Sequence, residues 1–328
     1  MGKNSKNLPG IKEVAKAAGV SSATVSRALN QHAYVSDEIR ERVLKIARRI
    51  GYAPTISSSR NLFGILASNE DGLLEEYSQQ VMMAVAGELF ANGCSVQIFS
   101  RRQFPYILRN TFRGVLVFNS EDAEFFLRAQ IPCVVVNDPR EPFWNVITDH
   151  AESTRIAVEY LLRNNHRRIA FLGAGYHAWG ADERKRGYIE AMRAAGIPEE
   201  EWLLGTFHSV GNGIPGAIAD LWKKGMTALI VEGEQNGLIA DHALKKLNVR
   251  IPEDLSLITF ESAYSRLMFP EHTTVSQDFP SLGKAVAETL LDLTVRSHRR
   301  KTSPSTQVFH NHLIERGSCR ELASSAAN

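Results

Sequence analysis

The N-terminal part of the chain carries a pattern of three short amphipathic helices, and this pattern limits the possible folds more than any other feature. Apolar residues recur at helical spacing over residues 11–18, and Gly19 follows as a residue suited to ending a helix. Ser21 and Ser36 are good N-caps for a second helix over residues 22–29 and for a third helix that begins after Ser36. Two short helices joined by a tight turn and supported by a third predict a helix-turn-helix.

In a helix-turn-helix, the N-terminal residues of the second helix face base edges in the major groove of DNA. An Arg side chain can bond guanine O6 and N7 together, whereas Ala and Ser can contact thymine methyls or single acceptors. Small polar and Tyr side chains nearby can reach phosphates, which position the protein without specifying sequence. The expected base-facing residues are Ser22, Ala23, Ser26 and Arg27, and the expected phosphate contacts are Ser21, Thr24, Asn30 and Tyr34.

The charge of the chain is unevenly distributed. Residues 1–60 contain eleven Lys and Arg residues and four acidic residues, so this segment carries a net charge of +7. Because the whole chain carries +2, the remaining residues carry −5. A basic segment on an acidic body is typical of a protein whose basic part binds a polyanion, here double-stranded DNA.

Beyond residue 62, short apolar runs alternate with helical stretches, which predicts an α/β fold with parallel sheets. About 260 residues exceed one ordinary sheet, so we expect two doubly wound lobes with a ligand cleft between them. The expected strands are 63–67, 95–99, 114–118, 133–136, 169–172, 228–231 and 257–260. The expected helices are 75–92, 123–130, 150–164, 183–195, 216–224, 235–247 and 279–296.

The composition is that of an ordinary globular protein, with 44% hydrophobic and 23% charged residues, which excludes a mostly disordered chain. No apolar run approaches the roughly 20 residues of a membrane helix, and the first residues lack the apolar segment of a secretory signal. Three widely spaced cysteines fit neither a disulfide framework nor a metal site. We therefore expect a cytoplasmic protein with no membrane partner, no cofactor, no metal and no catalytic residues.

Residues 11–30, with 35–36 and 51–54, closely resemble the DNA-binding headpiece of the lactose/galactose-repressor family of transcription regulators. The resemblance continues more loosely through segments such as 165–173 and 183–192 into that family's effector-binding core, which is similar to a periplasmic sugar-binding protein. It implies a homodimer that binds a pseudo-palindromic operator and responds to a small molecule such as a sugar or sugar derivative. It implies that Ser22, Ala23 and Arg27 read bases, and it places Ser21, Thr24, Asn30, Tyr34, Ser36 and Tyr52 near the DNA backbone.

The same resemblance implies that the chain crosses three times between the lobes, near Asn165, Ser276 and Phe309. The expected domains are a helix-turn-helix headpiece (1–54), a shortened linker or hinge (55–62), an N-terminal lobe (63–165 and 277–308), a C-terminal lobe (166–276 and 309–320) and a disordered tail (321–328).

Carried over position by position, the resemblance implies effector contacts at Asp149, Arg184 and Gln277. Where the family has further polar residues after two strands, this chain has Glu234 and Glu261, each with a longer side chain. Arg184 suits a forked donor to hydroxyls or a carboxylate, although it also fits a charged helix surface. Asp149 also fits as the N-cap of the following helix. Trp179, Phe207 and Tyr77 are candidate platforms for a sugar ring, although single aromatic residues more often lie in a core.

The linker departs from the family, whose short hinge helix inserts a Leu between base pairs. Here residues 54–62 lead directly into the first expected strand, and residues 57–59 are three serines, which are poor in a helix interior. Leu62 either acts as the wedge or begins that strand. We favour the strand, and therefore expect little or no intercalation by a hinge helix.

Two other patterns suggest competing functions. Residues 169–178 match a relaxed glycine-rich dinucleotide motif, but the acidic residue expected about 20 residues later is missing, so we interpret Gly173 and Gly175 as a turn at the cleft. His310 and His312 alternate on an expected strand and lack further metal ligands nearby in the sequence. The alternatives to a DNA-binding regulator, expected to be a repressor, are an α/β enzyme and a solute-binding protein.

Overall fold

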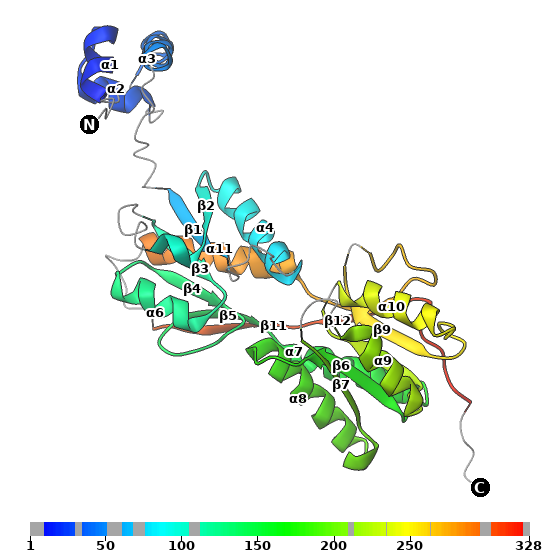
Figure 1. Cartoon of the computed structure of the whole chain (residues 1–328). Helices are drawn as coiled ribbons and strands as arrows, with labels where there is room; N and C mark the ends of the chain where they lie inside the picture. The colour runs from blue at the N-terminus through cyan, green and yellow to red at the C-terminus, as the bar shows by residue number, and fades with distance from the viewer. Residues whose placement is uncertain are drawn as a thin grey trace, which may run out of the picture.

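The computed structural model describes residues 10–29, 35–50, 61–67, 76–104, 112–208, 213–233, 235–262, 264–295 and 303–323. These residues form a three-helix headpiece and two α/β lobes (Figure 1). The predicted fold class is therefore confirmed. No helix in the described part of the chain is long and apolar enough to cross a membrane.

The headpiece consists of three helices, α1 (Ile11–Ala18), α2 (Ser22–Leu29) and α3 (Asp37–Arg49). Gly19 ends α1 in the left-handed conformation, with φ of 65°, which a glycine adopts without steric cost. The apolar faces of the helices meet in one small core, which confirms the sequence pattern. The buried residues of this core are Val14, Ala15, Ala18, Val25, Ala28, Val35, Val43 and Ala47.

The N-terminal lobe is built on a parallel six-stranded sheet in the order β11-β5-β4-β3-β1-β2. Helices α4 (Glu76–Ala91) and α11 (Phe279–Val295) pack on one face, and α6 (Ser120–Arg128) packs on the other, next to the short 3-10 helix η2 (Arg101–Gln103). The strands are β1 (Leu62–Leu66), β2 (Ser95–Phe99), β3 (Gly114–Val117), β4 (Cys133–Val136), β5 (Trp144–Thr148) and β11 (Thr306–Phe309).

The C-terminal lobe has a second six-stranded sheet in the order β12-β10-β9-β8-β6-β7, in which only the β10–β12 pair is antiparallel. Helices α9 (Ile214–Lys223) and α10 (Asn236–Lys246) cover one face, and α7 (His150–Arg163) and α8 (Trp179–Ala194) cover the other. The 3-10 helix η3 (Glu199–Glu201) precedes β7. The strands are β6 (Ile169–Ala174), β7 (Leu203–Phe207), β8 (Ala228–Val231), β9 (Ser256–Phe260), β10 (Thr273–Ser276) and β12 (His312–Ile314).

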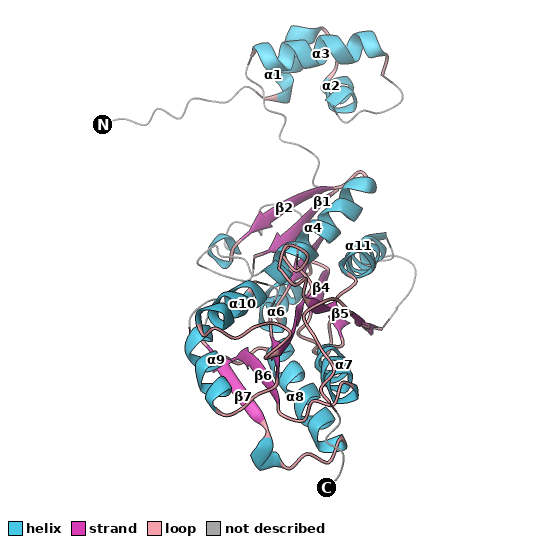
Figure 2. Cartoon of the chain, turned by 90° about the vertical axis from the view of Figure 1, so that its right-hand side faces the viewer, coloured by secondary structure: helices cyan, strands magenta, loops and turns pink. Residues whose placement is uncertain are grey.

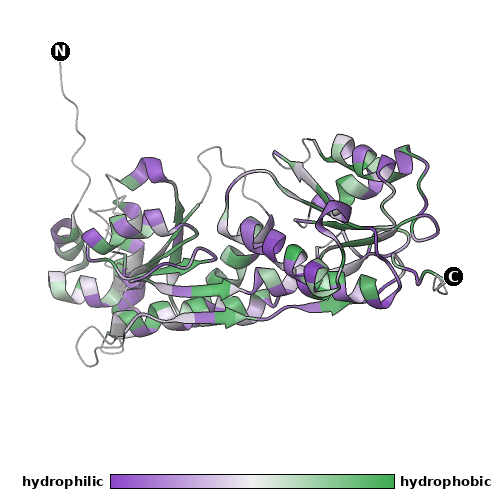
Figure 3. Cartoon of the chain, turned by 90° about the horizontal axis from the view of Figure 1, so that it is seen from below, coloured by the Kyte–Doolittle hydropathy of each residue, from purple (hydrophilic) through white to green (hydrophobic). Residues whose placement is uncertain are grey.

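Each sheet lies between layers of helices (Figure 2), and this arrangement explains the sequence of the central strands. All residues of β3, β4 and β8 are buried, because a parallel sheet with helices on both faces leaves no strand face in water. Hydropathy follows the same plan, with hydrophobic residues gathered along the strands and hydrophilic residues on the outward helix faces (Figure 3).

The first crossing between the lobes differs from the expected position near Asn165. The apolar face of helix α7 packs in the C-terminal lobe, where Ala157, Val158 and Leu161 share a core with β6 and α8. The chain therefore crosses after β5, at Asp149, and residues 150–165 belong to the C-terminal lobe. The other two crossings lie between β10 and α11 and between β11 and β12, close to the expected positions.

The start of the first core strand resolves the role that we favoured for Leu62. Leu62 is the first residue of β1 and pairs in register with Ser95 of β2. The prediction that Leu62 begins the strand is confirmed. Residues 51–60, which contain most of the linker, lie outside the described part of the chain.

Candidate functional site

Helix α2 presents a polar face on the side away from the headpiece core. Val25 and Ala28 are buried in that core, whereas Ala23 and Arg27 are exposed. The half-buried residues of the same helix are Ser22, Thr24 and Ser26. The residues expected to read bases therefore lie together at one accessible helix face.

Hydroxyl groups cap α2 and α3, as the sequence predicted. The Ser21 Oγ accepts a hydrogen bond from the Thr24 backbone N–H at 3.0 Å and lies 2.9 Å from the Thr24 Oγ1. The Ser36 Oγ accepts from the Ile39 backbone N–H at 3.4 Å. Helix N-termini attract anions through their free N–H groups and dipole, so both caps suit contacts with phosphate. The other expected contacts, Asn30, Tyr34 and Tyr52, lie outside the described residues.

A cavity of about 330 Å³ lies between the two lobes, within the range of small-molecule sites. The N-terminal lobe lines it with the start of α4 and with residues that follow β3 and β4. The C-terminal lobe contributes the loop after β6, the start of α8, the last residue of β7 and residues that follow β8. The polar or aromatic lining side chains are Glu76, Tyr77, Ser78, Phe118, Asn119, Asn137, His150, Tyr176, His177, Arg184, Phe207, Glu232, Gln235 and Asn236.

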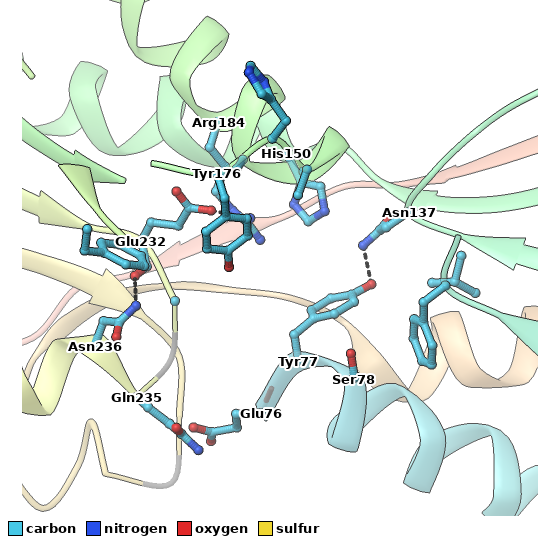
Figure 4. Close-up of a pocket in the computed structure, with 18 of the residues that line it drawn as sticks. Glu76, Tyr77, Ser78, Asn137, His150, Tyr176, Arg184, Glu232, Gln235 and Asn236 are labelled. Carbon is cyan, nitrogen blue, oxygen red and sulfur yellow. Dashed lines mark hydrogen bonds and ion pairs between the residues drawn. The ribbon is translucent and has the colours of Figure 1, made fainter. Parts of the chain in front are cut away.

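An ion pair between Arg184 and Glu232 occupies the C-terminal side of this cavity (Figure 4). The Arg184 Nη1 donates to the Glu232 Oε1 at 3.0 Å, and the two side chains are only 11% and 7% exposed. The other carboxylate oxygen accepts from the Ala174 backbone N–H at 2.9 Å. The Arg184 Cζ lies 5.0 Å from the centre of the Phe260 ring, which adds a cation–π contact.

Two glycines make this arrangement possible. A Cβ on Gly187 would lie 2.0 Å from the Ala151 carbonyl oxygen, so only glycine lets α8 approach α7 closely enough to bring Arg184 beside the crossing point. A Cβ on Gly173 would lie 2.9 Å from the Glu232 Oε2 and would displace the carboxylate. Gly173 lies within β6 and not in the expected turn, whereas residues shortly after it, Tyr176, His177 and Ala178, line the cavity.

His150 lies where the chain first crosses between the lobes, and its ring contacts both of them. The Tyr77 ring of α4 meets it edge-on at a centroid distance of 6.1 Å, and the Trp179 ring of α8 lies at 5.5 Å. Burial, helped by the positive charge of Arg184, lowers the pKa of His150 well below its usual value of 6.5. The imidazole is therefore neutral at physiological pH.

The N-terminal side of the cavity is held by Asn137, which lies at the end of β4. Its Nδ2 donates to the Tyr77 hydroxyl, and its Oδ1 accepts from the Thr148 backbone N–H at 2.7 Å. Figure 4 shows Tyr77 and Tyr176 among polar groups of the two lobes. Together these side chains give the cavity both aromatic surface and hydrogen-bonding groups.

The structure places the expected effector contacts in different environments. Arg184 lines the cavity, whereas Asp149, Glu261 and Gln277 are not among its lining residues. Glu234 lies outside the described part of the chain. Of the three aromatic candidates, Tyr77 and Phe207 line the cavity and Trp179 packs behind His150.

Asp149 and Glu261 are engaged in other interactions. The Asp149 Oδ1 accepts from the Glu152 backbone N–H at 2.8 Å, which makes Asp149 the N-cap of α7, the alternative role noted from the sequence. The two oxygens of Glu261 each accept a hydrogen bond from Arg316 at 2.9 Å. Neither carboxylate reaches the cavity in this arrangement.

His310 has acidic neighbours that its sequence surroundings did not indicate. Its Nδ1 lies 2.8 Å from the Glu152 Oε2, and Asp149 lies close by. The hydrogen bond that His310 donates to the Glu152 carboxylate raises the pKa of His310 above 6.5. These residues join the first and third crossings between the lobes.

Sequence reasoning missed Glu232 and His150, although a signal for each was present. Glu232 directly follows the apolar run of β8, and carboxyl ends of parallel strands face the ligand side of a sheet. His150 follows β5 in the same way, but β5 itself was not predicted. Matching the family pattern instead drew attention to Glu234, two residues further on.

Comparison with known proteins agrees with both parts of this architecture. Residues 10–55 match the family of bacterial regulatory proteins of the lacI type, and residues 158–319 match a periplasmic binding protein-like domain. The HTH-type transcriptional repressor PurR of Actinobacillus pleuropneumoniae is 25% identical, over 95% of this chain and 98% of the relative. The PurR repressor of Erwinia tasmaniensis is 29% identical, over 94% of this chain and 96% of the relative.

Solved structures give the same result. The transcriptional regulator CelR in complex with cellobiose is 25% identical, with a TM-score of 0.71, and the match covers 94% of this chain and 99% of that structure. The lac repressor dimer bound to operator and the anti-inducer ONPF has the same fold, with a TM-score of 0.78 at 22% identity over 95% of this chain and 99% of that one. This chain joins a DNA-binding domain of the LacI family of bacterial regulatory proteins to a periplasmic binding protein-like domain.

Proposed function

We propose that this chain is a cytoplasmic transcriptional repressor that binds a pseudo-palindromic operator as a homodimer. Its operator affinity is modulated by a small molecule, a sugar or sugar derivative, that binds in the cavity between the lobes. The observation that carries the proposal is the presence, on one chain, of an accessible recognition helix and an interlobe cavity lined with polar and aromatic groups. The cellobiose complex of CelR supports a sugar-sized ligand.

A dimer follows from the size of the headpiece. One helix-turn-helix contacts a short half-site, and specific binding of this motif usually requires two heads on symmetric half-sites. A ligand that binds differently to the open and closed lobes changes the separation of the two heads. By linkage, the effect of the ligand on operator affinity equals the effect of the operator on ligand affinity.

The direct test is a mobility-shift assay of the full-length protein on DNA selected by that protein from a random library. Arg27→Ala should cost about 1–3 kcal/mol of binding free energy on the selected site and relax specificity at one base pair. The matched control is Lys16→Ala, which removes a positive charge from the exposed surface of α1 and should affect all sequences alike. If Arg27→Ala weakens every sequence equally, Arg27 contacts phosphate and does not read a base.

The hinge remains part of the proposal. Because Leu62 pairs with Ser95 in β1, it would have to leave the sheet to reach the minor groove. We therefore propose that operator binding proceeds with little or no intercalation by Leu62. An operator complex with the Leu62 side chain between base pairs would contradict this.

An α/β enzyme is the second candidate. The cavity does contain two histidines and two carboxylates, but His150 is neutral and packed between aromatic rings, His177 is fully exposed, and Glu232 is engaged by Arg184. We propose that the cavity binds its ligand without converting it. Turnover of a sugar or nucleotide by the purified protein would favour the enzyme instead.

A further inference from the structure

The described lining of the interlobe cavity offers little positive charge to an anion. Its described lining contains two carboxylates, Glu76 and Glu232, and one permanent cation, Arg184. The imidazole of His150 is neutral, and the second lining imidazole, His177, is fully exposed, 3.7 Å from Asp182. An anionic ligand would therefore enter a space whose single permanent cation is already paired.

The pairing of Arg184 with Glu232 is built into the surrounding backbone. Glu232 is fixed at both oxygens, by Arg184 at 3.0 Å and by the Ala174 N–H at 2.9 Å, and Gly173 leaves the space that the carboxylate occupies. The Phe260 ring supports the guanidinium from behind. Glu232 therefore stays beside Arg184 as the local counter-charge.

Polar atoms around this pair are buried and have no hydrogen-bond partner among the described residues. They are the His150 Nδ1, the Asn236 Oδ1 and the Arg184 Nε. His150 and Asn236 are only 2% and 4% exposed. Because buried polar groups are almost always hydrogen-bonded in folded proteins, these atoms point to a ligand that supplies partners.

The unpartnered atoms include both donors and acceptors. The Arg184 Nε can only donate, the Asn236 amide oxygen can only accept, and a neutral imidazole can do either according to its tautomer. A hydroxyl group can serve all of them, because it donates one hydrogen bond and accepts others. A carboxylate or phosphate could satisfy Arg184 but not the amide oxygen.

We infer that the interlobe cavity takes a sugar-sized, hydroxyl-bearing ligand without negative charge, and that Glu232 is the residue that excludes anions. The inference rests on the proposed role of this cavity as the effector site, and it narrows the ligand class. An anion at Arg184 would lie within a few ångströms of the Glu232 carboxylate in a partly dehydrated space, where repulsion between like charges is much stronger than in water. An uncharged hydroxyl meets no such barrier.

The test uses calorimetric titration of the full-length protein with matched sugars. The neutral set is D-glucose, D-galactose, D-ribose and cellobiose, and each sugar is paired with its sugar acid and, for the monosaccharides, with its terminal phosphate. At least one neutral sugar should bind, and its anionic counterparts should bind at least about 100-fold more weakly, since each tenfold corresponds to 1.4 kcal/mol. Preference for a sugar acid or phosphate, or no binding by any neutral sugar, would overturn the inference.

Substitutions of Glu232 assign the selectivity to this residue. Glu232→Gln should raise affinity for the anionic counterparts at least about tenfold, because Arg184 then lacks its counter-charge. Glu232→Asp keeps the charge and should still exclude anions. Glu159→Gln is the matched control, because it removes a carboxylate that pairs with Arg155 on the exposed side of α7. An unchanged selectivity ratio in a folded Glu232→Gln protein would overturn the role of Glu232.

Two readouts separate this inference from the proposed function. Circular dichroism verifies that each variant is folded, and the ranking of neutral over anionic sugars in the wild-type protein tests the ligand class even if Glu232→Gln does not fold. A wild-type protein that fails to bind any selected DNA contradicts the regulator but not the charge preference. A reversed preference in a protein that binds its operator contradicts only the ligand class.

Discussion

The C-terminal lobe contains two arginine–carboxylate pairs that look alike in sequence and differ in what they leave available. Glu232 follows β8 and pairs with Arg184, and Glu261 follows the neighbouring strand β9 and pairs with Arg316. Burial of the arginines does not distinguish the pairs, because they are 11% and 8% exposed, and Glu261 is the more exposed carboxylate at 22% against 7% for Glu232. The difference lies in how completely each guanidinium is hydrogen-bonded.

We call the pair of Arg316 and Glu261 closed, because protein groups accept several hydrogen bonds from its guanidinium. Arg316 donates to both oxygens of Glu261, to the His272 carbonyl at 2.7 Å and to the Thr274 hydroxyl at 2.9 Å. Although burial opposes ionisation, hydrogen bonds from Arg316 and Thr274 hold the pKa of Glu261 below its usual value. Arg184, by contrast, lines a cavity and has a buried Nε without a hydrogen-bond partner among the described residues. A carboxylate at a strand end is therefore available to a ligand only where its partner's hydrogen bonds are incomplete.

The largest expected effect is on stability and comes from the closed pair. Arg316→Met should reduce the free energy of unfolding by about 3–5 kcal/mol, because it leaves the Glu261 carboxylate without its main partner in a mostly buried site. Urea unfolding followed by circular dichroism measures this loss. Glu271→Gln is the control, because Glu271 is 57% exposed and 3.7 Å from Arg316 and should contribute little. A loss below about 1 kcal/mol for Arg316→Met would contradict the contrast between the two pairs.

Arg184→Met should destabilise less and affect ligand response more. Arg184 makes one hydrogen bond to Glu232, which keeps its bond from Ala174, so we expect a loss of about 1–2 kcal/mol. The same variant should lose the response of operator affinity to the sugar that binds the wild-type protein, measured by mobility shift with and without that sugar. A full response in Arg184→Met would remove Arg184 from the effector site.

The smallest expected effect is on the pH dependence of stability. It should differ between the buried imidazole of His150 and the exposed imidazole of His310. The pKa of His150 lies well below 6.5 in the folded protein, so the unfolded chain binds the extra proton as the pH falls below 6.5. Stability should therefore decrease on acidification by up to about 1.4 kcal/mol per pH unit. Thermal unfolding at several pH values should show a shallower decrease in His150→Gln. Burial also lowers the pKa of His166. His166 therefore contributes the same loss of stability at low pH to the wild-type protein and to His150→Gln.

His310→Gln should change the pH dependence of stability in the opposite direction to His150→Gln. Because Glu152 raises the pKa of His310, the stabilisation from this pair is present below pH 6.5 and is lost as the pH rises through the raised value. The imidazole is 72% exposed, so the effect should be small and screened by salt. If both histidine variants shift the pH profile in the same direction, the assignment of their environments is wrong.

The headpiece was predictable from sequence because its signals are local. The caps Ser21 and Ser36, the turn at Gly19 and the spacing of apolar residues fix three helices within a few residues of one another. The central strands were predictable for a related reason, since burial on both faces makes them continuous apolar runs. In both cases the neighbours along the chain already determine the structure.

The missed elements depend on distant partners. The edge strand β11 is mostly exposed and becomes a strand by pairing with β5, which lies about 160 residues earlier. The β7 run, Leu203–Phe207, contains a glycine and pairs with β6. The single strand expected around His310 and His312 is wrong, because β11 ends at Phe309 and the three-residue β12 begins at His312 in the other sheet. Likewise, nothing local assigns α7 to one lobe, since this depends on its contacts with β6 and α8.

The candidate site shows the same division. Arg184 was found through the family resemblance, and the close approach of Gly187 to Ala151 explains why Arg184, three residues earlier on α8, lies at the cavity. Glu232 was not found, because its importance depends on Arg184 and Ala174, which lie on other elements. The sequence indicates which groups can ionise, but the folded neighbours decide which of them remain available.

The packing of Trp179 against His150 gives the protein a natural optical reporter. The indole ring lies 5.5 Å from an imidazole whose other neighbour, Tyr77, belongs to the opposite lobe. Rotation of one lobe against the other has to alter one of these two ring contacts, and the emission of an indole is sensitive to the groups beside it. In a variant whose other three tryptophans are replaced, Trp179 fluorescence would therefore report any change in the angle between the lobes, without an added label.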